Sequence, residues 1–320
     1  MRVMITGATG FIGSNLLSRL QDTRTDLDIR AMSRNAKKLK RKIGDSKIEV
    51  VEVDTKDYSS LKNALMGCDV AYYLIHSMEG SSPKEWKKFA ERDRKASENF
   101  ARAATECNVS RIIYLGGLVH ENEVKNGNKN NKNNISEHMK SRIEVGNILS
   151  TSSAKVTIFR AAVILGPGGA SYKMLKYLVE RLWIMVCPKW VLTKCQPIAL
   201  DDVITYLSKS LDVKETEGKT FDIGGLDTLT YKEMMTQYSK IINKKFLKII
   251  IIPFLTPRLS SYWVELITPV KASLARPLIE SLKFESVVKE NQIKNLIPIS
   301  LKSFKESILV AHREENKEQK

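Results

Sequence analysis

Short apolar runs alternate with amphipathic segments along the first half of the chain. Runs rich in valine and isoleucine predict strands, and apolar residues at helical spacing predict the helices between them. We expect strands at 2–8, 28–34, 48–54, 70–76, 111–117 and 156–162, and helices at 11–21, 58–67, 83–107 and 136–151, with a short basic helix after the second strand. Near-continuous apolar strands need helices on both sheet faces, and repeated strand–helix alternation indicates parallel strands with right-handed crossovers. The pattern therefore predicts an α/β fold built on a doubly wound parallel sheet.

After residue 165 the alternation becomes irregular, which indicates a second, smaller unit. Residues 172–186 predict an amphipathic helix leading into an apolar segment that is too short and too often charged to cross a bilayer. Further elements are expected as helices at 201–211 and 230–242, a strand at 220–225 and a buried strand at 247–254.

The net charge of +16, from 52 basic and 36 acidic residues, favours anionic partners such as nucleotides, nucleic acid or acidic lipid head groups. The excess can also be spread over a solvated surface, although 34–42 is a dense basic run and 125–134 a polar loop of low complexity. Nucleic acid is not expected as a partner, because the chain has no recognition-helix, RNA-binding-sheet or zinc-finger motif.

Cysteine and histidine usage argues against a metal centre. The four cysteines have no CxxC spacing and the four histidines form no HExxH, so we expect reduced thiols and no metal. The N-terminus has no charged-then-apolar leader, so no secretion signal is expected and the expected location is the cytoplasm.

The stretch TGATGFIG (6–13) directly follows the first predicted strand and opens the first helix. Gly7 permits a tight turn, Gly10 lets the backbone approach a pyrophosphate, and Gly13 lets helix and strand pack closely. The helix N-terminus adds free amides and the positive end of its dipole. This arrangement predicts dinucleotide binding.

The end of the second strand predicts which dinucleotide is bound. NAD-binding sites usually carry a carboxylate there, whereas this chain has Ser33 and Arg34, with Lys37 and Lys38 one turn on. A guanidinium can hold a 2′-phosphate through charge-assisted hydrogen bonds. We therefore expect NADP(H) to be preferred, with NAD(H) as the alternative; the other interpretation of Arg34 is a solvent-facing residue at a helix start.

These motifs resemble the extended and atypical short-chain dehydrogenase/reductases. The resemblance rests on TGATGFIG, on the arginine after the second strand, and on VEVDTKDYSSLKNAL (51–65), PIALDDV (197–203) and FDIGGLDTLTYKEMM (221–235). Within that family the stretches AYYLIHSM (71–78), RIIYLGGL (111–118) and FRAAVILGPGGAS (159–171) are similar to an atypical branch related to nitrogen-regulator-like sensors and to the nucleotide-binding accessory subunit of respiratory complex I. The resemblance implies a Rossmann domain at 1–165 plus 196–225 and a smaller C-terminal substrate lobe at 166–195 plus 226–312. The highly charged tail at 313–320 is expected to be frayed.

The resemblance also implies cofactor contacts. Asp54 would contact the adenine amino group, and Leu74 and His76 would lie beside the ribose and nicotinamide; alternatively, His76 caps a strand edge. The complete set of expected cofactor residues is Gly7, Thr9, Gly10, Phe11, Ile12, Gly13, Ser33, Arg34, Lys38, Asp54, Thr55, Leu74, His76 and Gly116.

The stretch EHMKSR (137–142) aligns with the tyrosine-xxx-lysine helix of that family, so His138 stands at the tyrosine and Arg142 at the lysine. Gly116 and Gly117 stand where the family has its serine. A histidine can exchange protons near neutral pH, and Arg142 can bind the nicotinamide ribose without deprotonating. His138 and Arg142 are therefore the candidate catalytic residues, although the helix can also be an ordinary amphipathic one.

Two functions fit this sequence. One is an NADP(H)-dependent reductase of a hydrophobic carbonyl or quinone-like substrate, in which His138 is the proton donor. The other is a redox sensor or assembly scaffold that binds NADP(H) without turnover. The apolar residues Trp183, Trp190, Phe254, Tyr262 and Trp263 fit a hydrophobic substrate or the core of the lobe. A protein partner and peripheral contact with an acidic membrane both remain open.

Overall fold

The computed structural model describes residues 1–44, 46–76, 83–119, 136–244, 246–252 and 257–318. Within them a parallel seven-stranded sheet has the order β11-β6-β5-β4-β1-β2-β3. Its strands are β1 (Arg2–Ile5), β2 (Asp28–Ser33), β3 (Glu49–Glu52), β4 (Val70–Tyr73), β5 (Arg111–Gly117), β6 (Lys155–Ala161) and β11 (Thr220–Ile223). The doubly wound α/β fold predicted from the apolar pattern is confirmed.

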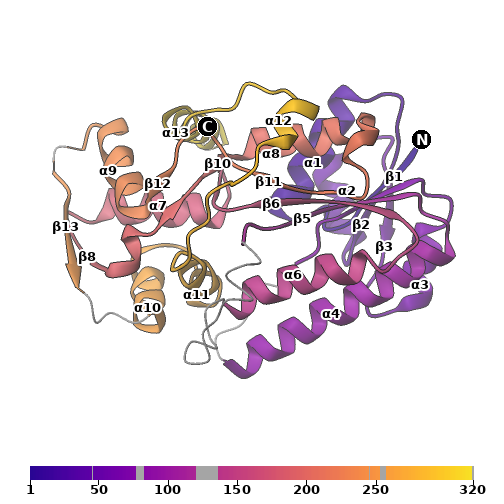
Figure 1. The fold of residues 1–320 in the computed structure, drawn as a ribbon, viewed down its shortest axis with the longest axis horizontal. Helices are drawn as coiled ribbons and strands as arrows, with labels where there is room; N and C mark the ends of the chain where they lie inside the picture. The colour runs from indigo at the N-terminus through magenta and orange to yellow at the C-terminus, as the bar shows by residue number, and fades with distance from the viewer. Residues whose placement is uncertain (45, 77–82, 120–135, 245, 253–256, 319–320) are drawn as a thin grey trace.

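Helices cover both faces of this sheet (Figure 1). On one face pack α1 (Phe11–Thr23), α2 (Ala36–Ile43), α8 (Leu200–Lys209) and α12 (Gln292–Leu296). On the other face pack α3 (Tyr58–Leu65), α4 (Pro83–Glu106) and α6 (Glu137–Leu149). Successive strand residues point to opposite faces, so Tyr72 belongs to the first apolar cluster and Tyr73 to the second.

A further apolar cluster forms the second unit, at the end of the long axis away from β3 (Figure 1). Its helices are α7 (Ala170–Arg181), α9 (Tyr231–Ile241), α10 (Pro257–Ile267), α11 (Ala272–Ser281) and α13 (Phe304–Glu318). Its short strands are β8 (Ile184–Pro188), β9 (Lys194–Cys195), β12 (Leu229–Thr230) and β13 (Lys248–Ile252), while β7 (Ile164–Leu165) pairs with β10 (Ile198–Ala199) between the two units.

One detail of this half completes the sequence-based expectations and two differ from them. The apolar segment after α7 is the strand β8, which pairs in parallel with β13. β13 is not buried: its residues alternate between exposed and half-buried, because only one face meets the core. The helix α13 continues to Glu318, through most of the segment for which a frayed tail was expected.

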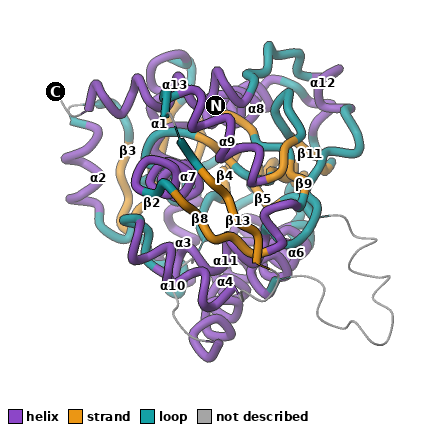
Figure 2. Tube along the Cα trace, turned by 90° about the vertical axis from the view of Figure 1, so that its left-hand side faces the viewer, coloured by secondary structure: helices purple, strands orange, loops and turns teal. Residues whose placement is uncertain are grey.

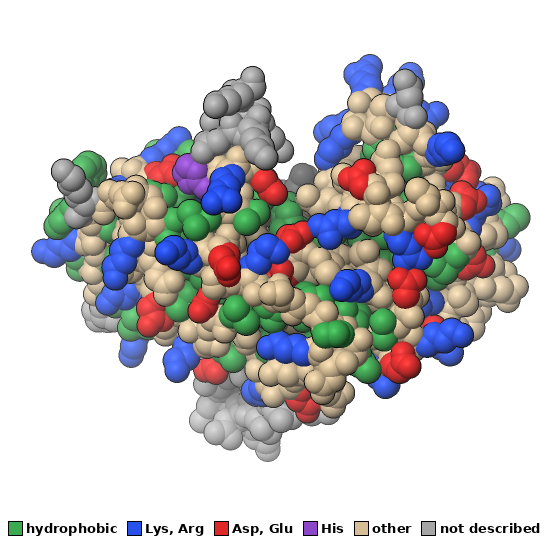
Figure 3. All heavy atoms as spheres, turned by 90° about the horizontal axis from the view of Figure 1, so that it is seen from above, with side chains coloured by type: hydrophobic (Ala, Val, Ile, Leu, Met, Phe, Trp, Pro, Cys, Tyr) green, Lys and Arg blue, Asp and Glu red, His purple; other side chains and the backbone are tan. Residues whose placement is uncertain are grey.

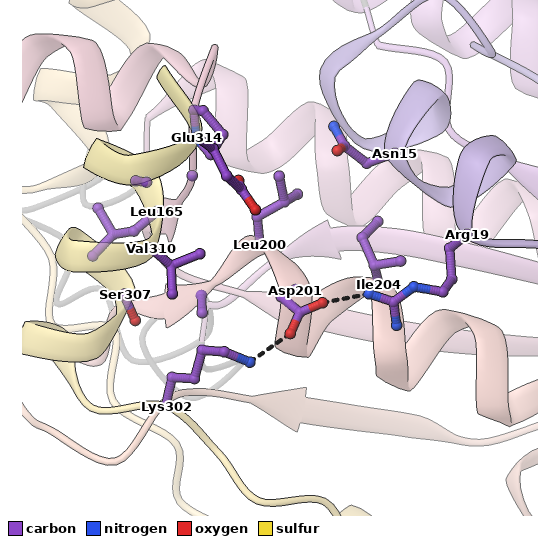
Figure 4. Close-up of a pocket in the computed structure, with 14 residues that line it drawn as sticks. Asn15, Arg19, Leu165, Leu200, Asp201, Ile204, Lys302, Ser307, Val310 and Glu314 are labelled. Atoms are coloured by element: carbon purple, nitrogen blue, oxygen red, sulfur yellow. Dashed lines mark hydrogen bonds and ion pairs between the residues drawn. The ribbon is translucent and has the colours of Figure 1, made fainter. Parts of the chain in front are cut away.

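A small cavity of about 120 Å³ lies where α1, α8 and α13 meet (Figure 4). The carboxylate of Asp201 on α8 accepts hydrogen bonds from Arg19 on α1 and from Lys302, which precedes α13. The buried carboxylate of Asp202 accepts the backbone N–H of Lys302 at 2.9 Å. These contacts fasten the C-terminal segment to the sheet domain.

Lysine and arginine side chains are interspersed with acidic ones across the face seen from above (Figure 3). Among the helices of the described residues, none is long and apolar enough to cross a membrane.

Candidate functional site

The glycine loop between β1 and α1 has the tight geometry that its spacing predicts. Gly7 has φ +63°, and a Cβ there would lie 2.6 Å from the carbonyl oxygen of Leu74 at the end of β4. A Cβ on Gly13 would overlap the carbonyl group of Gly7, so the first turn of α1 rests directly on the loop. Thr6 ties this loop to β4, since its Oγ1 donates to the Tyr72 carbonyl and accepts the Leu74 amide.

The N-terminus of α1 is open to an anion. Its N-cap is Gly10, and no side chain caps the helix there. The first amides of a helix lack intrahelical partners, and the dipole favours negative charge at that end. A backbone cradle of this kind fits a pyrophosphate, with Gly10, Phe11 and Ile12 nearest to it. Thr9 is exposed beside it.

Around the end of β2 the structure places the residues expected to hold a 2′-phosphate. Ser33 is buried, and its hydroxyl accepts the amide of Asn35, which caps α2. Arg34 and Lys38 are exposed, and no ion pair is recorded for either within the described residues. Glu52 at the end of β3 accepts the Ala36 amide at 2.9 Å, so this carboxylate caps the start of α2.

Asp54 and Thr55 lie in the turn after β3. The Asp54 carboxylate accepts the Lys56 amide at 3.0 Å, and the Thr55 carbonyl accepts the side-chain amide of Asn99 at 2.8 Å. These contacts stabilise the turn between β3 and α3.

A cavity of about 450 Å³ extends from the glycine loop to the second unit. It brings together nine of the expected site residues: Gly10, Phe11, Ile12, Gly13, Leu74, His76, Gly116, His138 and Arg142. The other expected residues, Gly7, Thr9, Ser33, Arg34, Lys38, Asp54 and Thr55, do not line it. Gly7 and Thr9 belong to the glycine loop. The other five lie at the end of β2, just after it, in α2 or in the turn after β3.

Three side chains form a hydrogen-bonded row beside the cavity. Asp93 on α4 is buried, and its Oδ2 lies 3.0 Å from Nδ1 of His76. Nε2 of His76 lies 3.1 Å from Nδ1 of His138. Because a carboxylate only accepts, the row orders the tautomers: His76 donates from Nδ1 to Asp93, and His138 donates from Nδ1 to His76. Nε2 of His138 is then an acceptor.

Both imidazoles are held in the neutral form. Burial and the Arg142 guanidinium lower the pKa of His76, against the opposing effect of Asp93. Burial, His76 and Arg142 lower the pKa of His138 well below its usual value. A neutral His138 is a general base or a hydrogen-bond acceptor at neutral pH.

Arg142 is fixed one turn after His138 on α6. Its guanidinium donates to the carbonyl of Leu115 near the end of β5 and lies 4.9 Å from the ring centroid of Tyr114. The Tyr114 hydroxyl in turn donates to the Arg142 carbonyl at 2.9 Å. The positive charge is thereby directed toward the cavity wall formed by the end of β5.

At the position where the resemblance implies a serine, a methionine side chain fills the space. A Cβ on Gly117 would lie 2.7 Å from Cε of Met139, and a Cβ on Gly116 would lie 3.2 Å from the Tyr114 ring. Neither glycine can take a hydroxyl-bearing side chain unless these neighbours move. The site therefore lacks a side-chain hydroxyl at this point.

Sequence reasoning predicted a substrate lobe but missed Asp93 and the particular residues with which the lobe lines the cavity. Asp93 is one of many charged residues along the long helix α4 and belongs to no recognisable sequence motif. The far wall of the cavity comes from the second unit and includes Met174, Tyr231, Leu274, Leu278 and Phe284. Within the described residues no group of three or more histidine, cysteine, aspartate or glutamate side chains could hold a metal ion.

Known structures share this fold over nearly their whole length. A nucleoside-diphosphate-sugar epimerase from Staphylococcus aureus matches with a TM-score of 0.69 at 17% identity, covering 96% of this chain and 99% of the epimerase. A triphenylmethane reductase from Citrobacter sp., complexed with NADP(H), matches with a TM-score of 0.72 at 17% identity, covering 97% and 100%. A UDP-glucuronic acid 4-epimerase from Bacillus cereus, in complex with UDP-glucuronic acid and NAD, matches with a TM-score of 0.74 at 14% identity, covering 99% of each chain. The fold is thus that of the short-chain dehydrogenase/reductase type.

A family model described as NAD(P)H-binding matches residues 7–177, more than half of the 320-residue chain. The chain belongs to this NAD(P)H-binding family. Among curated proteins it is 25% identical over 122 residues to the auxiliary protein GraX of Staphylococcus aureus (strain NCTC 8325 / PS 47). That match covers 38% of this chain and 38% of the length of GraX.

Proposed function

We propose that this protein is an NADP(H)-dependent reductase of a hydrophobic carbonyl or quinone-like substrate. The observation that carries the proposal is the single cavity that joins the glycine loop to His138 and Arg142 and then continues along apolar side chains of the second unit. Such a cavity can hold a nicotinamide against an apolar substrate. When bound, the nicotinamide supplies or accepts a hydride.

The proposed role of His138 is to exchange a proton with the substrate oxygen. In the ordered row its Nε2 is an acceptor, so the resting site is ready to take a proton from a hydroxyl. In the reducing direction the same nitrogen must first gain a proton, which the lowered pKa opposes at neutral pH. We therefore expect kcat/KM for reduction to rise as pH falls, until the fold itself is affected.

Arg142 is proposed to bind the nicotinamide ribose or a developing oxyanion. It cannot act as a base, because a guanidinium stays protonated. Its contacts with Leu115 and Tyr114 hold it near the place where Gly116 and Gly117 offer no hydroxyl.

Preference for NADP(H) is proposed from the end of β2. Arg34 and Lys38 are exposed there, and the nearby carboxylate of Glu52 is engaged by the amide of Ala36. A charge-assisted contact to the 2′-phosphate contributes about 1.5–3 kcal/mol, or about ten- to a hundred-fold in affinity.

The test is a titration of the purified chain with NADPH and NADH, followed by addition of quinones and small carbonyls. We expect Arg34→Asp to weaken NADPH binding at least about ten-fold and to spare NADH. Arg41→Asp is the matched control, since it makes the same charge change further along α2, where Arg41 is exposed. Equal loss of both nucleotides in Arg34→Asp refutes the 2′-phosphate role.

Turnover is tested with His138→Gln. We expect the rate of substrate-dependent NADPH oxidation to fall about a hundred-fold or more, because a general acid–base group contributes about 10²–10⁴-fold. NADPH affinity should stay within a few-fold. An unchanged oxidation rate would remove His138 from the mechanism.

A non-catalytic NADP(H) sensor or scaffold is the second candidate, favoured by the methionine that fills the serine position. Selective NADPH binding with no oxidation across the quinone and carbonyl panel is the result expected of it.

A further inference from the structure

The outer face of the β8–β13 ribbon is apolar. Val186 pairs with Ile250, and Pro188 with Ile252, in the parallel register. Ile184, Val186, Ile250 and Ile252 are 54%, 38%, 39% and 37% exposed. The opposite face, with Met185 and Cys187, is packed on the core of the second unit. A ribbon with one buried face normally presents polar residues on the other, so this outer face departs from the usual alternation.

Neighbouring side chains enlarge this face. Trp183 precedes β8 and is 62% exposed, and Tyr262 and Leu266 of α10 are 51% and 79% exposed. We call the set the end patch; it consists of Trp183, Ile184, Val186, Ile250, Ile252, Tyr262 and Leu266. β8 and β13 lie at one end of the long axis (Figure 1) and face the viewer in Figure 2. Single exposed apolar residues are ordinary, but a grouped set marks an interaction surface.

A second apolar cavity of about 450 Å³ adjoins the end patch. Val186, Tyr262 and Leu266 belong to both, which connects the β8 and α10 parts of the patch. Tyr231 lines this cavity and also the main cavity. One buried side chain, Tyr231, therefore borders both the second cavity and the proposed substrate site.

The sequence around most of the end patch is basic, although the exposed Glu265 is next to Leu266. Residues 181–194 and 240–264 contain eight lysines and arginines and no aspartate or glutamate. Arg181, Lys189, Lys194, Lys240 and Lys248 are exposed. Lys244 donates to the carbonyls of Val179, Glu180 and Leu182, and its Nζ lies 5.1 Å from the Trp183 ring centroid. On the face in Figure 3, by contrast, basic and acidic side chains are mixed.

We propose that the end patch docks the protein on the surface of an anionic lipid bilayer. Tryptophan and tyrosine favour the boundary between apolar and polar layers, and lysines around an apolar centre are attracted to acidic head groups. A second copy of the chain fits less well, because the same basic flanks would face each other across the interface. Docking in this way places the mouth of the second cavity at the bilayer, where an apolar substrate would dissolve.

The test is co-sedimentation of the full chain with vesicles of phosphatidylcholine alone and of phosphatidylcholine with phosphatidylglycerol. We expect binding to the anionic vesicles only, weakened by high salt. Trp183→Ser/Leu266→Ser should reduce that binding at least about ten-fold, since two large apolar side chains leave the lipid. Met66→Ser/Leu226→Ser is the matched control, because Met66 and Leu226 are 56% and 59% exposed and lie outside the end patch.

A second variant tests the charge. Lys189→Glu/Lys248→Glu should weaken binding to anionic vesicles at least about ten-fold, at about 1 kcal/mol for each lysine near the surface plus the repulsion of the new carboxylates. Equal binding to both vesicle types, no binding to either, or equal loss in the control variant would each overturn the proposal. Self-association that Trp183→Ser/Leu266→Ser abolishes, without vesicle binding, would assign the end patch to a second copy instead. NADPH titration of the same variants tests the cofactor site separately.

Discussion

Among single residues, the row from Asp93 to His138 has the strongest bearing on chemistry. Asp93 does not line the cavity, so its effect must pass through His76. A carboxylate behind a histidine pair fixes ring orientation and tautomer, which decides whether Nε2 of His138 accepts or donates. We therefore assign Asp93 and His76 as positioning residues for His138.

Replacement of the carboxylate should disturb the tautomer order. In Asp93→Asn the amide can donate to His76, which permits the reverse tautomers along the row. We expect turnover to fall about ten- to a hundred-fold, a fraction of a full general acid–base contribution. The pH profile of kcat/KM should shift while NADPH affinity is retained. A fall in rate with an unchanged pH profile would mean that Asp93 has only a structural role.

A substitution at Gly13 tests whether α1 and the glycine loop need to approach each other closely. The Cβ of Gly13→Ala would overlap the Gly7 carbonyl, so the backbone must move. We expect a loss of about 1–3 kcal/mol in the free energy of unfolding, as for other overpacked sites, together with weaker NADPH binding. Urea denaturation and nucleotide titration measure the two effects. Ser14→Ala, on the next residue of α1, should change neither.

Among the elements, α6 has the most direct part in the site. It supplies His138 and Arg142 and packs on α4 and β5. Its N-cap is Ser136, whose hydroxyl accepts the Met139 amide at 3.2 Å. α4 supplies Asp93, and the end of β4 precedes His76. The row therefore joins α4, α6 and the turn after β4, and its protonation state is linked to the packing of all three.

This linkage predicts acid sensitivity. His76 and His138 have lowered pKa values in the folded state, whereas in the unfolded chain they titrate at about 6.5. As pH falls below that value, the unfolded state binds protons that the native state does not, so stability is lost. Each such histidine contributes a slope of up to about 1.4 kcal/mol per pH unit. Within the described residues, the charged groups that face this pair are Asp93 and Arg142.

Urea unfolding between about pH 7.5 and 5.5, above the range of ordinary carboxylates, measures this slope. We expect His76→Asn/His138→Asn to have a shallower dependence than the unmodified chain. The same slope in both would show that other groups dominate the acid sensitivity.

On the scale of the whole molecule, two apolar cores are held together around one cavity. The sheet domain supplies the glycine loop, His138 and Arg142, and the second unit supplies the apolar far wall. The contact of Asp201 with Lys302 (Figure 4) and that of Asp202 with the Lys302 backbone fasten the chain that returns from one core to the other. The relative placement of the two walls therefore depends on this junction.

The two neighbouring aspartates at the junction should differ in importance. Asp202→Ala leaves the backbone N–H of Lys302 without its partner, and we expect a loss of about 1–3 kcal/mol. Asp201 has a half-exposed side chain, so Asp201→Ala should cost less than about 1 kcal/mol, as exposed ion pairs do. Thermal or urea unfolding ranks the two. A larger loss in Asp201→Ala would place the junction's stability in the ion pairs instead.

Much of the fold was predictable because its signals are local. The strands and the glycine loop could be predicted from apolar runs and glycine spacing, and the family from the resemblance of its motifs. The structure confirms the sheet, and the comparisons confirm an NAD(P)H-binding family. β13 was wrongly expected to be buried, because a run of isoleucines looks the same whether one face or both meet a core. The roles predicted for individual site residues stay predictions, although nine of those residues line one cavity.

The sequence by itself determined the elements, their order and the backbone cradle, because helix periodicity, strand runs and glycine turns depend on neighbours in the chain. Only the tertiary structure decided that Asp93, His76 and His138 form a row, since they come from two helices and a strand end and their meeting requires the packing of α4 against α6. It also decided the far wall of the cavity and the end patch, which depend on where the second unit lies and which side of β8 and β13 its core covers.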